Sequence, residues 1–167
     1  MAIIDGYLRE LDTEHDLTRR VVEAIPDDKL AWKPHPRSMS LGQLTYHIAA
    51  IPGLVAELSL PDEVPAPRFP MPPSVASRAE AVALLAESVA KAQRLLAGLS
   101  DERMLAVWRM KAAGKEVLAL PRAVMLRAMM LNHWYQHRGQ LMVYLRLLDR
   151  PVPNVYGPSA DMNPFST

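Results

Sequence analysis

The chain has 167 residues, half of them apolar, and a formal net charge of +1 at neutral pH. This length supports a core of its own, so residues 1–167 are expected to form a single domain. The balanced charge leaves no electrostatic footprint for nucleic acid or for a membrane, and neither is expected as a partner. Cysteine is absent, which excludes disulfide bonds, thiolate metal ligands and a cysteine nucleophile.

The N-terminal residues do not resemble a secretion signal, because Arg9 and Glu10 interrupt the first apolar run. No long uncharged apolar run follows that could span a membrane. These two observations predict a soluble, cytoplasmic protein.

Apolar residues recur at helical spacing in four segments of the chain. Pro26 closes the first segment, and Ser38 or Ser40 is a suitable N-cap for the second. Pro52–Gly53 interrupts the second segment and predicts a kink in it, with helix continuing beyond. Pro121 suits the first turn of the last segment. The predicted helices cover about residues 4–25, 40–58, 77–99 and 121–148.

The connections between these helices differ in character. Residues 60–74 contain six prolines and almost no pattern, which predicts a long surface connection. Two apolar runs flank Gly114 and predict a small hairpin before the last helix. The tail from Pro151 is expected to be irregular. The resulting fold class is all-α: an antiparallel four-helix bundle with its long connection between the second and third helices.

Two histidines in the last predicted helix stand four residues apart. On a helix this spacing places His133 and His137 on one face, one turn apart, and that face is the apolar stripe. His47 lies on the apolar face of the second helix, beside Leu44 and Ile51. Three inward imidazoles would form a metal site with coordination positions left open. Each histidine could instead be an ordinary core residue whose ring nitrogens are satisfied, and the pattern leaves that alternative open.

Other polar residues near these positions have weaker claims. Gln140, one turn beyond His137, could orient a bound water or substrate, or could make an ordinary hydrogen bond between helices. His15 is a candidate fourth ligand, neighbouring group or proton carrier, with a packed core histidine as the alternative. His35 lies between two prolines and is expected to be exposed. Arg138 could clamp a carboxylate, although a salt bridge is the simpler interpretation.

A further prediction concerns the first helix, on which Glu14 and Arg19 are expected to form a solvated, ion-paired surface.

Two stretches resemble a known family. The first runs from Trp32 to Leu44 (Trp-Lys-Pro-His-Pro-Arg-Ser-Met-Ser-Leu-Gly-Gln-Leu) and is followed by His47. The second runs from His133 to Leu141 and ends in His-Arg-Gly-Gln-Leu. Their order and separation are similar to those of the DinB/YfiT-like family, and the resemblance spans nearly the whole chain.

This resemblance implies a four-helix bundle with an up-down-down-up course, a divalent metal (nickel or zinc) and a homodimer. The metal histidines of the family fall on His47, His133 and His137, the residues that the spacing also favours. Several relatives are transferases or isomerases that use low-molecular-weight thiols. No residue of this chain marks a particular thiol.

Two classes of function are therefore weighed. The first is a metal-dependent enzyme acting on a small molecule: a thiol S-transferase that uses small electrophiles, or a metal-hydroxide hydrolase. The second is a non-catalytic, metal-binding, stress-response dimer. The second is supported by the lack of an identifiable acid, base or nucleophile beyond the histidines.

Overall fold

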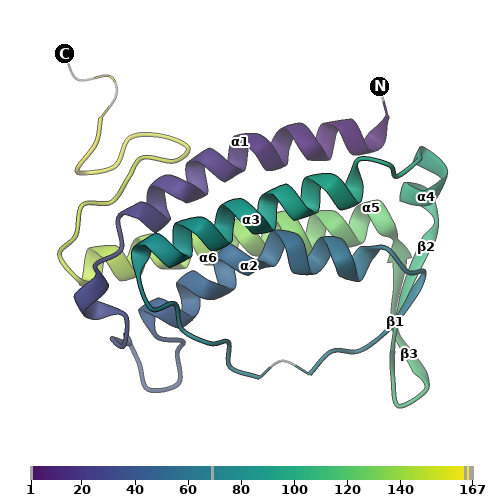
Figure 1. The fold of residues 1–167 in the computed structure, drawn as a ribbon, viewed down its shortest axis with the longest axis horizontal. Helices are drawn as coiled ribbons and strands as arrows, with labels where there is room; N and C mark the ends of the chain where they lie inside the picture. The colour runs from purple at the N-terminus through teal and green to yellow at the C-terminus, as the bar shows by residue number, and fades with distance from the viewer. Residues whose placement is uncertain (1, 69, 164, 166–167) are drawn as a thin grey trace.

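The computed structural model describes residues 2–68, 70–163 and 165. Its long helices lie side by side, as Figure 1 shows. They are α1 (Ile3–Glu23), α2 (Leu41–Ser59), α3 (Arg78–Leu96) and a last segment formed by α5 (Arg122–Met125), the π-helical η2 (Leu126–Asn132) and α6 (His133–Leu147). The shorter elements are the 3₁₀ helix η1 (Asp27–Lys29), α4 (Asp101–Leu105), β1 (Glu63–Pro65), β2 (Val107–Ala112) and β3 (Lys115–Pro121).

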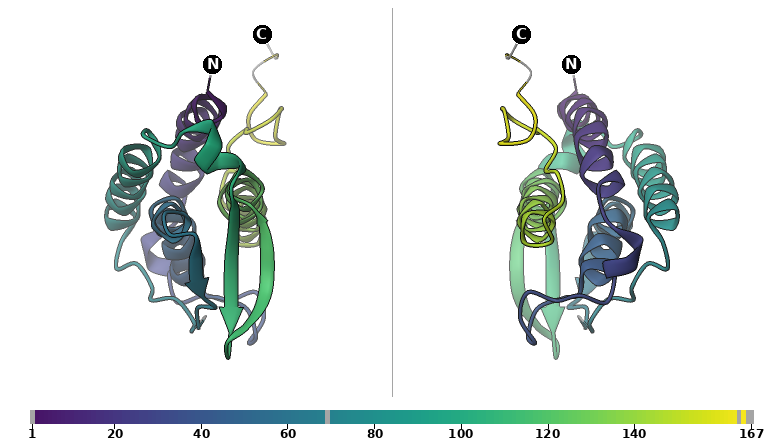
Figure 2. Two further views of the ribbon diagram at one scale, coloured as in Figure 1. Left: turned by 90° about the vertical axis from the view of Figure 1, so that its right-hand side faces the viewer. Right: turned by 90° about the vertical axis from the view of Figure 1, so that its left-hand side faces the viewer.

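A three-stranded mixed sheet at one end of the helices shows that the all-α prediction is wrong (Figures 1 and 2). β2 and β3 form the antiparallel hairpin that the apolar runs around Gly114 predict. Ala113 and Gly114 turn the chain in left-handed conformations, with φ of 48° and 77°. The protein is therefore a mixed α/β structure in which the sheet caps one end of the helices.

The proline-rich connection supplies the third strand, β1, which pairs in parallel with β2. Proline cannot donate to a neighbouring strand, so a strand that contains it is confined to the edge of a sheet. β1 occupies the edge and is joined to β2 by hydrogen bonds that flank it. Arg109 N–H donates to the Asp62 carbonyl at 2.9 Å, and Ala66 N–H donates to the Lys111 carbonyl at 2.6 Å. The sequence pattern does not predict this strand, because its prolines interrupt the alternation of apolar residues that usually indicates a strand.

The long connection also sets the direction of the helices. It carries the chain back along the molecule after α2, so α2 and α3 run in the same direction (Figure 1). α2 packs against α3 on one side and against the last helical segment on the other. Its central place is reflected in its burial, since Leu41, Leu44 and Ile48 are fully inaccessible to solvent.

α2 continues through Pro52 and Gly53 because α3 supplies polar groups at that point. Gly53 N–H donates to Ser88 Oγ at 2.8 Å, and the Ser88 hydroxyl donates to the Ala50 carbonyl at 3.2 Å. Gly53 also allows a close approach of the two helices. A Cβ atom at this position would lie 3.1 Å from Ser88 Oγ and 3.2 Å from the Ser88 carbonyl oxygen.

The Gly53→Ala variant is expected to lower the free energy of unfolding by about 1–3 kcal/mol, because a carbonyl fixed in α3 cannot move away from the new methyl group. Gly6 is the matched control: it is an exposed glycine in α1, and a Cβ there would meet nothing within 4 Å. Gly6→Ala should raise stability by about 0.5–1 kcal/mol. Urea unfolding of both variants tests this, and a Gly53→Ala protein as stable as the parent would contradict it.

In the described part of the chain, no helix has the length and apolar character needed to cross a membrane.

Candidate metal centre

The start of α2 fixes the position of His47. The Ser40 hydroxyl oxygen accepts the Gln43 backbone N–H at 3.2 Å, and the Gln43 side-chain oxygen accepts the Ser40 N–H at 2.9 Å. This reciprocal capping box defines the first turn of the helix. His47 follows about two turns later, half-buried, on the side of α2 that faces the last helix.

Pro52 helps to hold the last helix against α2 at this level. Proline has no N–H, so the carbonyl four residues earlier, that of Ile48, loses its usual helical donor. The Trp134 indole N–H donates to this carbonyl at 2.9 Å, and the Trp134 side chain is fully buried. Because Trp134 directly follows His133, this bond aligns α6 with α2 next to the histidines.

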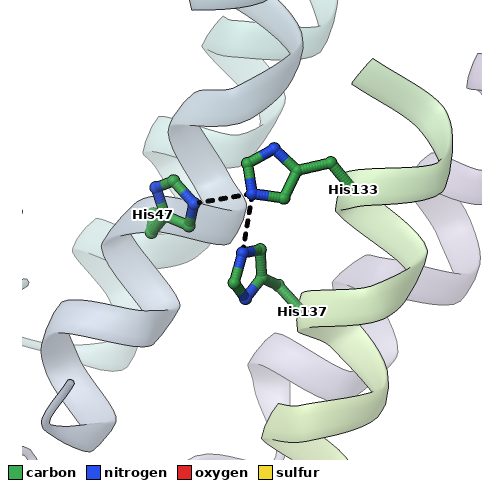
Figure 3. Close-up of side chains that lie close together, drawn as sticks. All are labelled: His47, His133 and His137. Atoms are coloured by element: carbon green, nitrogen blue, oxygen red, sulfur yellow. Dashed lines mark hydrogen bonds between the residues drawn. The ribbon is translucent and has the colours of Figure 1, made fainter. Parts of the chain in front are cut away.

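The three histidines that the spacing favours lie together, with their rings directed at one another between α2 and α6 (Figure 3). The Nε2 atoms of His47 and His133 are 3.3 Å apart, and those of His133 and His137 are 2.7 Å apart. All candidate ligand atoms of the group lie within 4.8 Å of one another. The helical register thus brings His47 to a pair formed 86 residues later in the chain.

In each imidazole, the partner of the nitrogen that faces away from the group influences which ring nitrogen carries the proton. His137 Nδ1 lies 2.8 Å from the Gln140 side-chain oxygen, so this nitrogen carries the proton. The backbone carbonyl of Met129 interacts with the His133 ring, whose Nε2 is directed at the other two rings. In His137, Nε2 is therefore left with a lone pair, and Nε2 of His133 lies 2.7 Å from it. Without a metal the two nitrogens can share a proton in a hydrogen bond, and a divalent cation can replace that proton.

This donor set fits a divalent metal ion. Metal–imidazole bonds of about 2.0–2.1 Å place neighbouring nitrogens about 2.8–3.4 Å apart, depending on the angle at the metal. The 3.3 Å separation lies within this range, and the 2.7 Å separation is slightly shorter. Neutral imidazole suits zinc, nickel and other first-row transition metals. His47, His133 and His137 are the residues that could hold such an ion.

The protonation of the three rings also suits metal binding. Burial, with the neighbouring His137 and His133, lowers the pKa of His47 from 6.5 to about 4. Burial likewise lowers the pKa of His133 and of His137, although Met129 and Gln140 act in the opposite direction on their respective rings. All three imidazoles are consequently neutral at pH 7, which is the form that binds metals.

These lowered pKa values predict how the stability of the metal-free protein depends on pH. Between about pH 6.5 and pH 4 the unfolded chain takes up a proton on His47 that the folded chain does not bind. The contribution of His47 to the free energy of unfolding should therefore be constant above about pH 6.5. It should fall as the pH is lowered from about 6.5 to about 4. Urea unfolding midpoints at several pH values measure this dependence. The His47→Gln variant is the control, and an equally steep pH dependence in it would contradict the assignment.

The other residues singled out in the sequence lie outside the histidine group. His15 is not part of the group, and its Nε2 is buried without a hydrogen-bond partner among the described residues. His35 is exposed, and its Nδ1 accepts the Arg37 N–H at 3.2 Å. Gln140 contacts His137 as described above. Arg138 forms a salt bridge instead of facing the histidines.

That salt bridge corrects the prediction of a solvated surface at Glu14. Glu14 is buried, and its carboxylate accepts hydrogen bonds from Arg138 Nη1 at 2.7 Å and from the Tyr156 hydroxyl at 2.8 Å. Arg138 Nη1 also donates to Thr18 Oγ1 at 3.0 Å. The network joins α1, α6 and the C-terminal tail. Its members are far apart in the sequence, so local charge patterns do not reveal it.

Comparison with known proteins agrees with this architecture. Residues 10–141 match the family model described as the DinB superfamily.

The chain belongs to the DinB superfamily.

The predicted resemblance to this family is thereby confirmed. Among DinB relatives and neighbours, the uncharacterized protein YrdA of Bacillus subtilis is 26% identical over 159 residues, which cover 95% of this chain and 90% of YrdA. A DinB-like protein from Bacillus cereus has a TM-score of 0.71 at 22% identity, covering 93% of this chain and 98% of that one. The DinB-like protein YjoA of Bacillus subtilis has a TM-score of 0.67 at 22% identity, covering 89% and 95% of the respective chains. These two structures show that the DinB fold is shared.

Proposed function

We propose that this DinB protein is a divalent-metal-dependent enzyme whose metal, nickel or zinc, is held by His47, His133 and His137. The observation that carries the proposal is the convergence of three neutral imidazoles whose candidate ligand atoms all lie within 4.8 Å of one another. A divalent metal bound by three imidazoles has further coordination positions open for a substrate.

The proposed reaction is the transfer of a low-molecular-weight thiol to a small electrophile. A divalent metal bound by three imidazoles would supply Lewis acidity, which lowers the pKa of a thiol or water that binds beside it. In the transfer, sulfur forms a bond to the electrophilic carbon, the leaving group departs with its bonding electrons, and the thiol proton passes to solvent. The chain has no cysteine, so it must obtain its sulfur nucleophile from a second molecule.

The residues around the histidines would keep the site in working order. Gln140 holds the ring of His137 in one tautomer, and the Met129 carbonyl interacts with the ring of His133. The Trp134–Ile48 hydrogen bond keeps the two helices in register. These contacts would preserve the arrangement of the ligands while substrates exchange.

The test is to load the purified protein with nickel or zinc and combine a panel of small thiols with a panel of small electrophiles. Loss of free thiol that requires the metal and disappears in His47→Ala, His133→Ala and His137→Ala is the expected result. His35→Ala serves as the control because His35 is exposed and lies outside the group. Metal-dependent ester or amide hydrolysis without any thiol would favour a hydrolase. Metal binding without turnover on either panel would favour a non-catalytic role.

A further inference from the structure

The last long helix is irregular immediately before the histidine pair. Residues Leu126–Asn132 form a π-helical segment, η2, between α5 and α6. A π turn inside an α-helix accommodates one extra residue and changes which carbonyls the backbone N–H groups reach. η2 ends directly before His133, so the altered bonding falls on a proposed metal ligand.

The backbone of His133 shows the effect of this altered bonding. In a regular α-helix its N–H would donate to the carbonyl four residues earlier, which is that of Met129. Here the His133 N–H is directed instead at the carbonyls of Ala128 and Met130. The Met129 carbonyl interacts with the His133 side chain and favours a proton on its ring. The π turn thus redirects the backbone donor and leaves the Met129 carbonyl available to the imidazole.

We propose that η2 is the positioning element of the metal centre, because it supplies the Met129 carbonyl that holds His133 with Nδ1 protonated and Nε2 directed at His47 and His137. This inference rests on the proposed function. Met129 and Gln140 have matching roles on neighbouring rings, one through its backbone and one through its side chain. Outer hydrogen bonds of this kind fix the tautomer and orientation of metal-binding histidines.

A backbone acceptor cannot be removed by changing its side chain, so the informative variant shortens the helix. Deletion of Ala128, an exposed residue within η2, removes the extra residue that the π turn accommodates. α5 and α6 then keep their buried faces, and Met129 remains four residues before His133 in a regular helix. In this variant the His133 backbone N–H donates to the Met129 carbonyl and competes with the His133 imidazole for that acceptor.

Two measurements test the proposal. The first is nitrogen NMR of the full-length protein labelled with ¹⁵N-histidine, with the five histidines assigned by single His→Gln variants. His133 in the wild-type protein should be protonated at Nδ1, both without metal and with zinc, and zinc should bind at Nε2. The second is zinc affinity by competition with a chelator. Deletion of Ala128 should weaken binding by about 10- to 100-fold, as should Gln140→Ala.

The two variants should differ in the ring that they affect. Deletion of Ala128 should alter the Nδ1–H signal of His133 and leave that of His137 unchanged, whereas Gln140→Ala should do the reverse. Ala128→Gly is the control, because it loosens the helix without shortening it and should keep zinc affinity within about fivefold of wild type, the factor that corresponds to the roughly 1 kcal/mol that such a change costs the helix.

Coordination of zinc through Nδ1 of His133, or a protonated Nε2 on that ring in the metal-free protein, would overturn the proposal. An Ala128 deletion that folds and binds zinc as tightly as wild type would also overturn it. The wild-type spectra decide the question if the deletion variant does not fold. Failure of the wild-type protein to bind zinc or nickel would instead refute the proposed function, and the tautomer of His133 in the metal-free protein would still test the role of η2.

Discussion

Replacing His137 with alanine is expected to weaken binding of nickel and zinc by well over the roughly 10- to 100-fold that loss of an outer hydrogen-bond partner causes. The reason is that His137 contributes one of the three candidate ligand nitrogens, and its Nε2 lies only 2.7 Å from that of His133. Chelator competition measures the affinity. Metal content by mass spectrometry, on protein purified without a metal-binding tag, measures the stoichiometry.

Thermal unfolding gives an independent reading of the same variant. A ligand that binds only the folded state at about 100 times its dissociation constant stabilises that state by about 2.7 kcal/mol. Added metal should therefore raise the melting temperature of the wild-type protein and of His35→Ala, but not that of His137→Ala. Equal stabilisation of all three proteins would show that the metal binds elsewhere.

Replacing Arg138 with methionine is expected to lower the free energy of unfolding by about 3–5 kcal/mol, because it leaves the Glu14 carboxylate buried without its cation. The side chains of Arg138 and Glu14 are only 2% and 9% exposed, so solvent cannot replace the lost partner. Urea unfolding measures the change. It should be accompanied by loosening of the tail, because the Tyr156 hydroxyl contacts both residues.

The double variant Glu14→Leu/Arg138→Met separates the two possible causes of this loss. Removing both charges should restore most of the stability, since a buried ion pair is often replaceable by apolar side chains. The matched control is the exposed pair Arg19–Glu23 on the same helix, whose side chains are 41% and 43% exposed. Arg19→Met should change stability by no more than about 1 kcal/mol. A double variant as unstable as Arg138→Met would indicate lost packing in place of an uncompensated charge.

The histidine group shows what short-range periodicity can predict. The spacing of His133 and His137 and the place of His47 on an apolar face are local properties, and the structure brings these three residues together. The partner of His137, Gln140, could also be identified because it lies one helical turn away. Metal binding by the group stays a prediction until it is measured.

The features that the sequence did not reveal depend on distant partners or on backbone bonding. Glu14 resembles a surface residue until Arg138, 124 residues later, is placed beside it. β1 exists because β2 offers it an edge, and its prolines hide it from pattern analysis. The π turn of η2 leaves the order of apolar side chains in the last helix looking helical throughout. The Met129 carbonyl is a backbone group that every residue has, so the sequence cannot single it out.

Irregular backbone on both sides of the site has the same result. Pro52 in α2 deprives the Ile48 carbonyl of its helical donor, and Trp134 takes that carbonyl. η2 redirects the His133 N–H, which leaves the Met129 carbonyl to interact with the His133 ring. In each case a backbone carbonyl that would accept a hydrogen bond within a regular helix is left available to a side chain at the site.

The same-direction course of α2 and α3 has a consequence for how the chain folds. Helices joined by a short loop can pair as soon as both have formed, but α2 and α3 are separated by the whole connection that contains β1. Their packing, and the pairing of β1 with a strand more than forty residues later, both require closure of long loops. Such distant contacts slow folding in comparison with simple up-and-down bundles of similar size. The histidine group joins residues 86 positions apart, so it can form only after these distant contacts between helices have formed.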